Sequence, residues 1–143
     1  MSLPIPEQGM VISYSYLWRY EHDNGLEEGR KDRPCVIILA TEKKQAGIEV
    51  TIVPITHKQP ASSEFSLEIP LRVKEYLGLD MDTSWVIINE ANQFIWPGFD
   101  LRPIRTKNGQ QYYGFIPPKL FDRIKHEMLD LLIKQRIAIT SRD

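Results

Sequence analysis

Short apolar runs separated by polar turns occupy the first two-thirds of the chain. The run PCVIILAT at residues 34–41 is almost continuously apolar, which is typical of a central strand that is covered on both faces. The other runs are rich in β-branched and aromatic residues, which favour strands. We therefore predict further short strands at residues 9–18, 47–56, 65–69, 84–88 and 92–96.

Two local signals refine this strand pattern. Pro54 lies inside the run GIEVTIVPIT and cannot donate a ladder hydrogen bond, so we expect this strand to lie at an edge or to end there. Within residues 103–114, Asn108 is followed by Gly109, which is the strongest two-residue signal for a β-hairpin. A hairpin is therefore expected in that segment.

Two segments have the spacing of helices. Residues 70–79 begin with a proline, which suits a first helical turn, and Gly78 is placed to cap the end. Residues 117–137 carry an apolar stripe at helical spacing, with most charges on the other face. The stripe consists of Leu120, Ile124, Met128, Leu131 and Leu132.

A long polar segment, YEHDNGLEEGRKDR, covers residues 20–33 and precedes the central strand. Asn24, Gly25 and Gly29 should break any regular structure in it. The segment is either a plain solvated loop or a mobile loop that carries function, since binding residues often lie on loops held by a rigid sheet.

These elements predict a mainly β protein with accessory helices. Several short strands at close spacing favour a small barrel or sandwich. A doubly wound sheet is disfavoured because strands and helices do not alternate regularly. The 143 residues suit a single domain over residues 1–143.

Composition narrows the functional class. Hydrophobic content of 42% and charged content of 26% are ordinary for a soluble globular protein. A formal net charge of −1 argues against a general nucleic-acid coat, although a local basic groove is compatible with it. Cys35 is the single cysteine, so a disulfide or a cysteine-based metal site within one chain is excluded, and a reducing, cytoplasmic setting fits.

Targeting and cofactor signals are lacking. The N-terminus has no basic region followed by an apolar stretch, and no apolar run approaches the ~18 residues of a membrane helix. The chain has no GxxxxGK[ST], GxGxxG, HExxH or GxSxG motif, and three scattered histidines give little support for a metal site. We expect no cofactor, no metal and no membrane contact.

Three short patches could carry chemistry. Arg33 precedes the central strand, and its planar guanidinium matches phosphate oxygens unless it only pairs with acids of the same loop. Thr56 and His57 end the VPITH run, where they could bind a phosphate and transfer a proton; both serve one site only if the strand has ended by His57. Glu90 is a lone acid at a strand end, and solvation alone would explain it.

The order of these patches resembles the MazF/PemK family of toxin–antitoxin toxins, over roughly residues 8–133. A strand opens with glycine, QGMVISYSY, and a polar loop then ends in Arg-Pro before a hydrophobic strand, EEGRKDRPCVIILA. Next come the Pro-x-Thr strand VTIVPITH, the segment SLEIPLRVKEYLGL, the strand WVIINEANQFIW with its acid, and a closing amphipathic helix. Each motif is short, and their order carries the resemblance.

The resemblance implies a fold and an activity. The fold would be an SH3-like small β-barrel with a C-terminal amphipathic helix. The family acts as homodimers that cleave single-stranded RNA without a metal, and a cognate antitoxin protein holds them inactive by occupying the RNA groove. The chain would then be the toxin of a type II toxin–antitoxin system.

The resemblance also assigns roles to residues. Arg33 matches the Arg-Pro arginine and would stabilise phosphate charge, and Thr56 matches the Pro-x-Thr threonine and would hydrogen-bond the scissile phosphate. Glu90 falls where many members carry an aspartate and would be an acid or base, whereas His57 is a candidate from chemistry alone. Nearby cations are expected to bind RNA: Arg19, Arg30, Lys31 and Lys58.

Departures from the family pattern leave alternatives open. The loop before Arg33 is longer and more acidic than usual, the segment after Glu90 lacks the usual basic residue, and residues 97–114 look like an elaboration. A barrel that has lost catalysis and only binds RNA or protein would explain the acidic balance. A purely structural protein whose groove is a dimer seam is the third reading.

Overall fold

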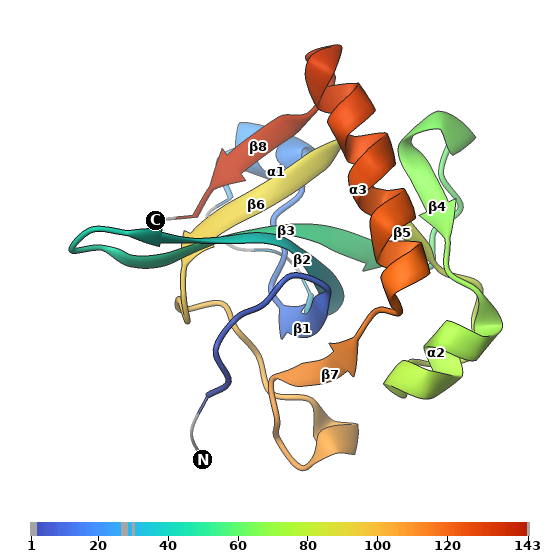
Figure 1. The fold of residues 1–143 in the computed structure, drawn as a ribbon, viewed down its shortest axis with the longest axis horizontal. Coiled ribbons are helices and arrows are strands. Elements are labelled where there is room, and N and C mark those ends of the chain that lie inside the picture. Colours follow the sequence, from blue (N-terminus) through green and yellow to red (C-terminus); the bar gives the residue numbers. More distant parts are fainter. Residues whose placement is uncertain (1–2, 27–28, 30, 143) are drawn as a thin grey trace.

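The computed structural model describes residues 3–26, 29 and 31–142, which form antiparallel strands together with three α-helices (Figure 1). The strands are β1 (Met10–Tyr14), β2 (Arg33–Lys43), β3 (Gly47–Thr56), β4 (Ser66–Glu68), β5 (Trp85–Ile87), β6 (Glu90–Ile95), β7 (Tyr112–Phe115) and β8 (Ala138–Ser141). The helices are α1 (Arg19–Asp23), α2 (Leu71–Leu77) and α3 (Pro118–Ile133), with short 3-10 turns η1 (Ser63–Phe65) and η2 (Arg105–Lys107).

The strands pair in the order β4-β5-β3-β2-β1-β7, and β6 joins β3 to β8. Every pairing is antiparallel except β6 with β8, which is parallel. Strands β4 and β7 are the ends of the path, so the strands of the described residues form no closed hydrogen-bonded ring. The predicted mainly β class with a C-terminal amphipathic helix is confirmed, as is the central position of β2 between β1 and β3.

Strand β3 corrects one expectation about Pro54. The strand runs on to Thr56 and lies in the interior of the sheet, so the prediction of an edge strand or a strand end at Pro54 was wrong. Residues 49–52 of β3 pair with β6, and Ile55 and Thr56 pair with β5. Pro54 lies between these two pairings, so its missing donor falls where β3 changes partner.

Two elements were not anticipated. Helix α1 occupies the start of the polar segment 20–33, where no regular structure was expected; the Glu21 carboxylate accepts a hydrogen bond from the Trp18 N–H at 3.1 Å and caps its first turn. The predicted helix over 117–137 ends at Ile133, and β8 follows it. Gln135, with a φ of 56°, lies in the turn between them.

The Asn108-Gly109 pair forms a turn, but not the predicted hairpin. Both residues have positive φ, as the sequence pattern suggested. The turn follows η2 rather than a strand, and β7 takes β1 as its partner. The hairpin prediction was wrong because the residues before the turn form no strand that could pair with β7.

The core is made of two apolar clusters on either side of the sheet. The larger one combines Val36 and Val53 of the sheet with buried residues of α3, and the smaller one surrounds Tyr14 and Phe94. Four of the five stripe residues of α3 are buried, and Leu132 is exposed. Among the described residues, no helix has the length and apolar character that crossing a membrane would require.

Candidate functional site

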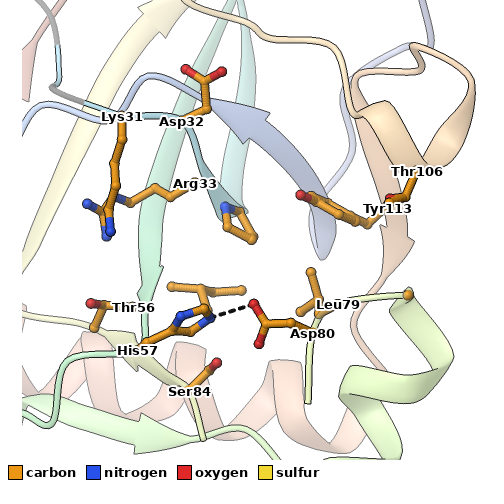
Figure 2. A pocket seen from close by; sticks show the side chains of 13 residues that line it. Lys31, Asp32, Arg33, Thr56, His57, Leu79, Asp80, Ser84, Thr106 and Tyr113 are labelled. Atoms are coloured by element: carbon orange, nitrogen blue, oxygen red, sulfur yellow. Dashed lines mark ion pairs between the residues drawn. The ribbon is translucent and has the colours of Figure 1, made fainter. Parts of the chain in front are cut away.

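Two adjoining cavities open where β2 begins and β3 ends. We call them the Asp80 cavity, of about 530 Å³, and the Trp18 cavity, of about 620 Å³. Four side chains line both of them: Lys31, Arg33, Thr56 and His57. Figure 2 shows Lys31 and Arg33 on one wall of the Asp80 cavity, with Thr56, His57 and Asp80 on the wall opposite.

Arg33 is the first residue of β2 and pairs in register with Tyr14 of β1. Its guanidinium lies over the Trp18 ring, 5.0 Å from the ring centroid. The Nε atom is buried and has no hydrogen-bond partner among the described residues. A buried donor without a partner costs about 1–3 kcal/mol. The guanidinium also carries a positive charge beside the two cavities that Arg33 lines, and this charge favours an anion there.

Thr56 and His57 reach the same cavities because β3 ends between them. Strand alternation would send neighbouring side chains to opposite faces, but Thr56 is the last strand residue and His57 lies in the following bend. The Thr56 hydroxyl accepts a hydrogen bond from the Lys58 N–H at 3.2 Å. Its own proton stays available to donate to an oxygen in the cavity.

His57 contacts two acids of the loop that follows α2. Its Nε2 lies 2.8 Å from Asp80 Oδ2 (Figure 2). Its Nδ1 lies 4.0 Å from Asp82 Oδ2, which is too far for a hydrogen bond. Burial raises the pKa of Asp80, but the Lys74 hydrogen bond and the His57 and Lys74 charges outweigh it and hold this pKa below its usual range. Asp80 is therefore ionised at neutral pH.

Lys74 of α2 is 1% exposed, and its ammonium is the cation behind Asp80. It donates to Asp80 Oδ1 at 3.0 Å, to the Ser84 hydroxyl at 2.7 Å and to the Asp82 carbonyl. All three donors of the ammonium are thus used. These hydrogen bonds hold the loop that carries Asp80 in place.

His57, Asp80 and Asp82 are also the one group of possible metal ligands in the described part of the chain, with ligand atoms within 4.8 Å of one another. All three residues are exposed. The Lys74 ammonium already neutralises Asp80 and would repel a second cation beside it. We therefore assign no metal to this group.

Glu90 lies apart from this site and lines neither cavity. Its Oε1 accepts hydrogen bonds from the Tyr16 hydroxyl at 3.1 Å and from the Arg19 N–H at 3.0 Å. Burial raises the pKa of Glu90, and these two donors offset part of that effect. The carboxyl therefore tethers the start of α1 to β6.

The expected RNA-binding cations fall into three groups. Lys31 lines both cavities and Lys58 lines the Trp18 cavity. Arg19 is directed to β8, where its Nη1 donates to the Ile139 carbonyl at 3.2 Å, and it lines neither cavity. Arg30 lies outside the described residues.

Sequence reasoning missed the residues behind His57. Lys74 lies three positions before Leu77 on the buried face of α2, and a cation at an apolar helical position is a usable signal for a buried charge. Asp80 and Asp82 lie two and four positions after Gly78, which caps α2. Two acids so close to a helix end are the second signal for a partner of this buried charge. Thr106 and Tyr113, from the elaboration at 97–114, also line the Asp80 cavity.

Cys35 takes no part in this site. Its thiol is buried and donates to the Arg33 carbonyl at 3.6 Å, and burial raises the pKa of the thiol far above the usual range. A thiol that stays protonated is a poor nucleophile. Cys35 therefore belongs to the core.

The fold is shared with a protein of known structure. A chain of the crystal structure of MazE-MazF (Form-III) from Deinococcus radiodurans superimposes with a TM-score of 0.56 at 14% identity, covering 90% of this chain and 97% of that chain. No protein-family model matches the sequence, and no curated protein matches it either. The likeness confirms the predicted MazF-like fold.

Proposed function

We propose that this protein is a toxin of the MazF type that cleaves single-stranded RNA without a metal. The observation that carries the proposal is the meeting of Arg33, Thr56 and His57 at two adjoining cavities, with the Arg33 Nε buried and without a partner among the described residues. A cation, a hydroxyl donor and an imidazole that can accept a proton are what RNA cleavage by the neighbouring 2′-hydroxyl needs.

The reaction uses these groups as follows. The ribose 2′-oxygen forms a bond to the adjacent phosphorus and the bond to the 5′-oxygen breaks, which leaves a 2′,3′-cyclic phosphate and a 5′-hydroxyl. His57 accepts the proton of the 2′-hydroxyl, and water supplies a proton to the departing 5′-oxygen. Arg33 and Thr56 donate to the phosphate oxygens, whose negative charge grows in the transition state.

Neighbouring groups would place the RNA on either side of the scissile phosphate. Lys31 and Lys58 are cations at the cavity walls, and Trp18 and Tyr20 line the Trp18 cavity, where a base could stack. Tyr20 is 59% exposed, so its ring is accessible to a ligand. We propose that an antitoxin protein blocks the same cavities, as the shared fold with a chain of a MazE-MazF complex suggests.

The homodimer is proposed to form through a separate apolar groove. This α3 groove, of about 570 Å³, is bordered by α3, β2 and β8 and exposes Leu39, Leu129, Leu132 and Ile139. A second copy is the occupant favoured by the family resemblance, because such an apolar surface is unusual on a monomer.

The dimer can be tested by light scattering at micromolar concentration. Leu132→Asp should weaken self-association by about 100-fold, because it places a charge in the apolar interface. Leu71→Asp is the matched control, since Leu71 is 53% exposed on α2 and lines no part of the groove. A wild-type monomer, or a Leu132→Asp dimer of unchanged strength, would contradict the proposal.

Cleavage itself is tested with purified protein and defined single-stranded RNAs in EDTA. The proposal predicts cleavage, and its loss when Arg33→Ala and Thr56→Ala are combined. Binding without cleavage across varied RNA sequences would instead favour the binding-module reading. Cleavage that survives the double substitution would contradict the assignment of this site.

A further inference from the structure

We propose that Lys74 and Asp80 are positioning residues that fix which nitrogen of His57 carries the proton. The inference rests on the proposed function, because it makes Nδ1 the acid–base atom of the cleavage site. Nothing in the order of sequence motifs assigned a role to either residue. The proposal stands on an unbroken chain of contacts from the core to the cavity.

The first link is the ammonium of Lys74. All its donors are occupied, and one of them is held by Asp80 Oδ1 at 3.0 Å. Because Lys74 belongs to α2 and is 1% exposed, its position is set by the packing of the helix. An ammonium has no acceptor, so whatever atom stands at the Oδ1 position must be an acceptor.

The second link is the carboxylate itself. Its other oxygen, Oδ2, lies 2.8 Å from His57 Nε2 (Figure 2). An ionised carboxylate only accepts hydrogen bonds, so Nε2 must donate. Neutral His57 is then the Nε2–H tautomer, with the lone pair on Nδ1.

The remaining charges around His57 agree with this assignment. Asp82 Oδ2 is 4.0 Å from Nδ1, beyond hydrogen-bonding distance, and Lys31 and Arg33 lie on the opposite wall of the Asp80 cavity. Lys58 follows His57 in the chain and lines only the Trp18 cavity. Nδ1 is therefore the ring nitrogen that no described residue engages by a hydrogen bond.

Asp80→Asn gives the decisive test. The amide has one oxygen and one NH₂ group, and the oxygen takes the Oδ1 position because the Lys74 ammonium donates there at 3.0 Å and the Asp82 N–H at 3.1 Å. The NH₂ group then faces Nε2 and donates to it, which forces the Nδ1–H tautomer. Nitrogen NMR of ¹⁵N-labelled histidine at alkaline pH, without RNA, should show the Nε2–H tautomer in the wild type and the Nδ1–H tautomer in Asp80→Asn.

Adding Lys74→Met to Asp80→Asn provides the rescue. Without the ammonium only the Asp82 N–H, at 3.1 Å from the Oδ1 position, still holds the amide oxygen there. The amide can then turn its oxygen toward His57 in part of the molecules, so the Nε2–H tautomer should return in part. RNA cleavage should follow the tautomer: about a 100-fold loss in Asp80→Asn, and partial recovery in the double variant. A merely structural role for Lys74 predicts further loss on adding the second substitution.

Asp82→Asn is the matched control and should leave the tautomer unchanged. A folded Asp80→Asn protein that keeps the Nε2–H tautomer would overturn the proposal. This single-variant experiment still decides the question if Lys74→Met prevents the double variant from folding. A double variant that folds and keeps the Nδ1–H tautomer would overturn the role of Lys74. The tautomer is measured without RNA, so it does not depend on cleavage. If the wild type and the variants show the expected tautomers but the wild type does not cleave RNA, only the proposed function is contradicted.

Discussion

Arg33 and Arg142 both lie over aromatic rings, but their surroundings differ. Arg142, just after β8, is 5.3 Å from the Tyr14 ring centroid, and its side chain is 2% exposed. It donates to the Ser15 carbonyl at 3.0 Å, to Asn92 Oδ1 at 2.9 Å and to Asp100 Oδ2 at 2.6 Å. Arg33 is 5.0 Å from the Trp18 ring centroid, and its buried Nε has no hydrogen-bond partner in the described part of the chain.

The difference separates a structural arginine from a functional one. Arg142 connects the C-terminal strand to β1, to β6 and to the loop before β7. Its guanidinium already donates to an acid, an amide and a carbonyl, so few of its donors remain for a ligand. The Arg33 guanidinium stacks on the Trp18 ring, its Nε has no acceptor among the described residues, and the side chain lines two cavities. An unsatisfied buried donor in a folded protein calls for an explanation, and an anionic substrate supplies one.

The largest expected effect is on catalysis at Arg33. Arg33→Ala should lower the single-turnover rate of RNA cleavage by about 10²–10³-fold, since it removes a donor to the transition-state phosphate. The thermal midpoint should change little, because the wild-type guanidinium leaves a buried donor unpaired. Arg123→Ala, at an exposed position of α3, is the control. Equal cleavage rates for the two variants would contradict a functional role of Arg33.

The opposite pattern is expected at Arg142. Arg142→Met should lower the free energy of unfolding by about 2–3 kcal/mol, because it removes the 2.6 Å donor to Asp100 Oδ2 and one of the two donors to Asn92 Oδ1. Denaturant titration measures this loss. Cleavage per folded molecule should stay near the wild-type value, and a large fall in that quantity would show that Arg142 acts at the site.

The smallest effect concerns Glu90, which lines neither cavity. Its pKa is raised in the folded protein, so the folded state binds the proton more tightly, and Glu90 costs stability as pH rises through that pKa. Glu90→Gln keeps an acceptor for Tyr16 and Arg19, so it should gain less than about 1 kcal/mol at neutral pH. Relative to wild type, this gain should vanish at acid pH.

Cleavage by the same variant decides the role of Glu90. The location outside both cavities predicts a near wild-type rate for Glu90→Gln. A folded variant that has lost cleavage would restore the acid–base role that the family resemblance implied. Unfolding curves at acid and neutral pH separate that outcome from simple destabilisation.

The sequence predicted the fold and the strand-end residues of the site better than the residues that lie behind His57. Arg33, Thr56 and His57 could be proposed from the sequence because they lie at strand ends, where the local pattern indicates the direction of a side chain. Their partner Asp80 comes from a loop after α2, and a contact across that distance in sequence leaves no local pattern. Lys74 was visible as a charge on an apolar face, but its partners depend on the folded loop.

The errors in the fold have the same origin. Pro54 was expected at an edge because its missing donor was judged from local sequence, while the sheet places it between two partner strands. Strand β8 was missed because its parallel pairing with β6 spans much of the chain.

The most direct test is analysis of the ends produced from one defined single-stranded RNA by the wild-type protein in EDTA. The account predicts a 2′,3′-cyclic phosphate on one fragment and a 5′-hydroxyl on the other. It also predicts that a single 2′-deoxy substitution at the cleaved position abolishes the cut. Cleavage that persists at the 2′-deoxy position, or a folded protein that leaves every RNA intact, would contradict it.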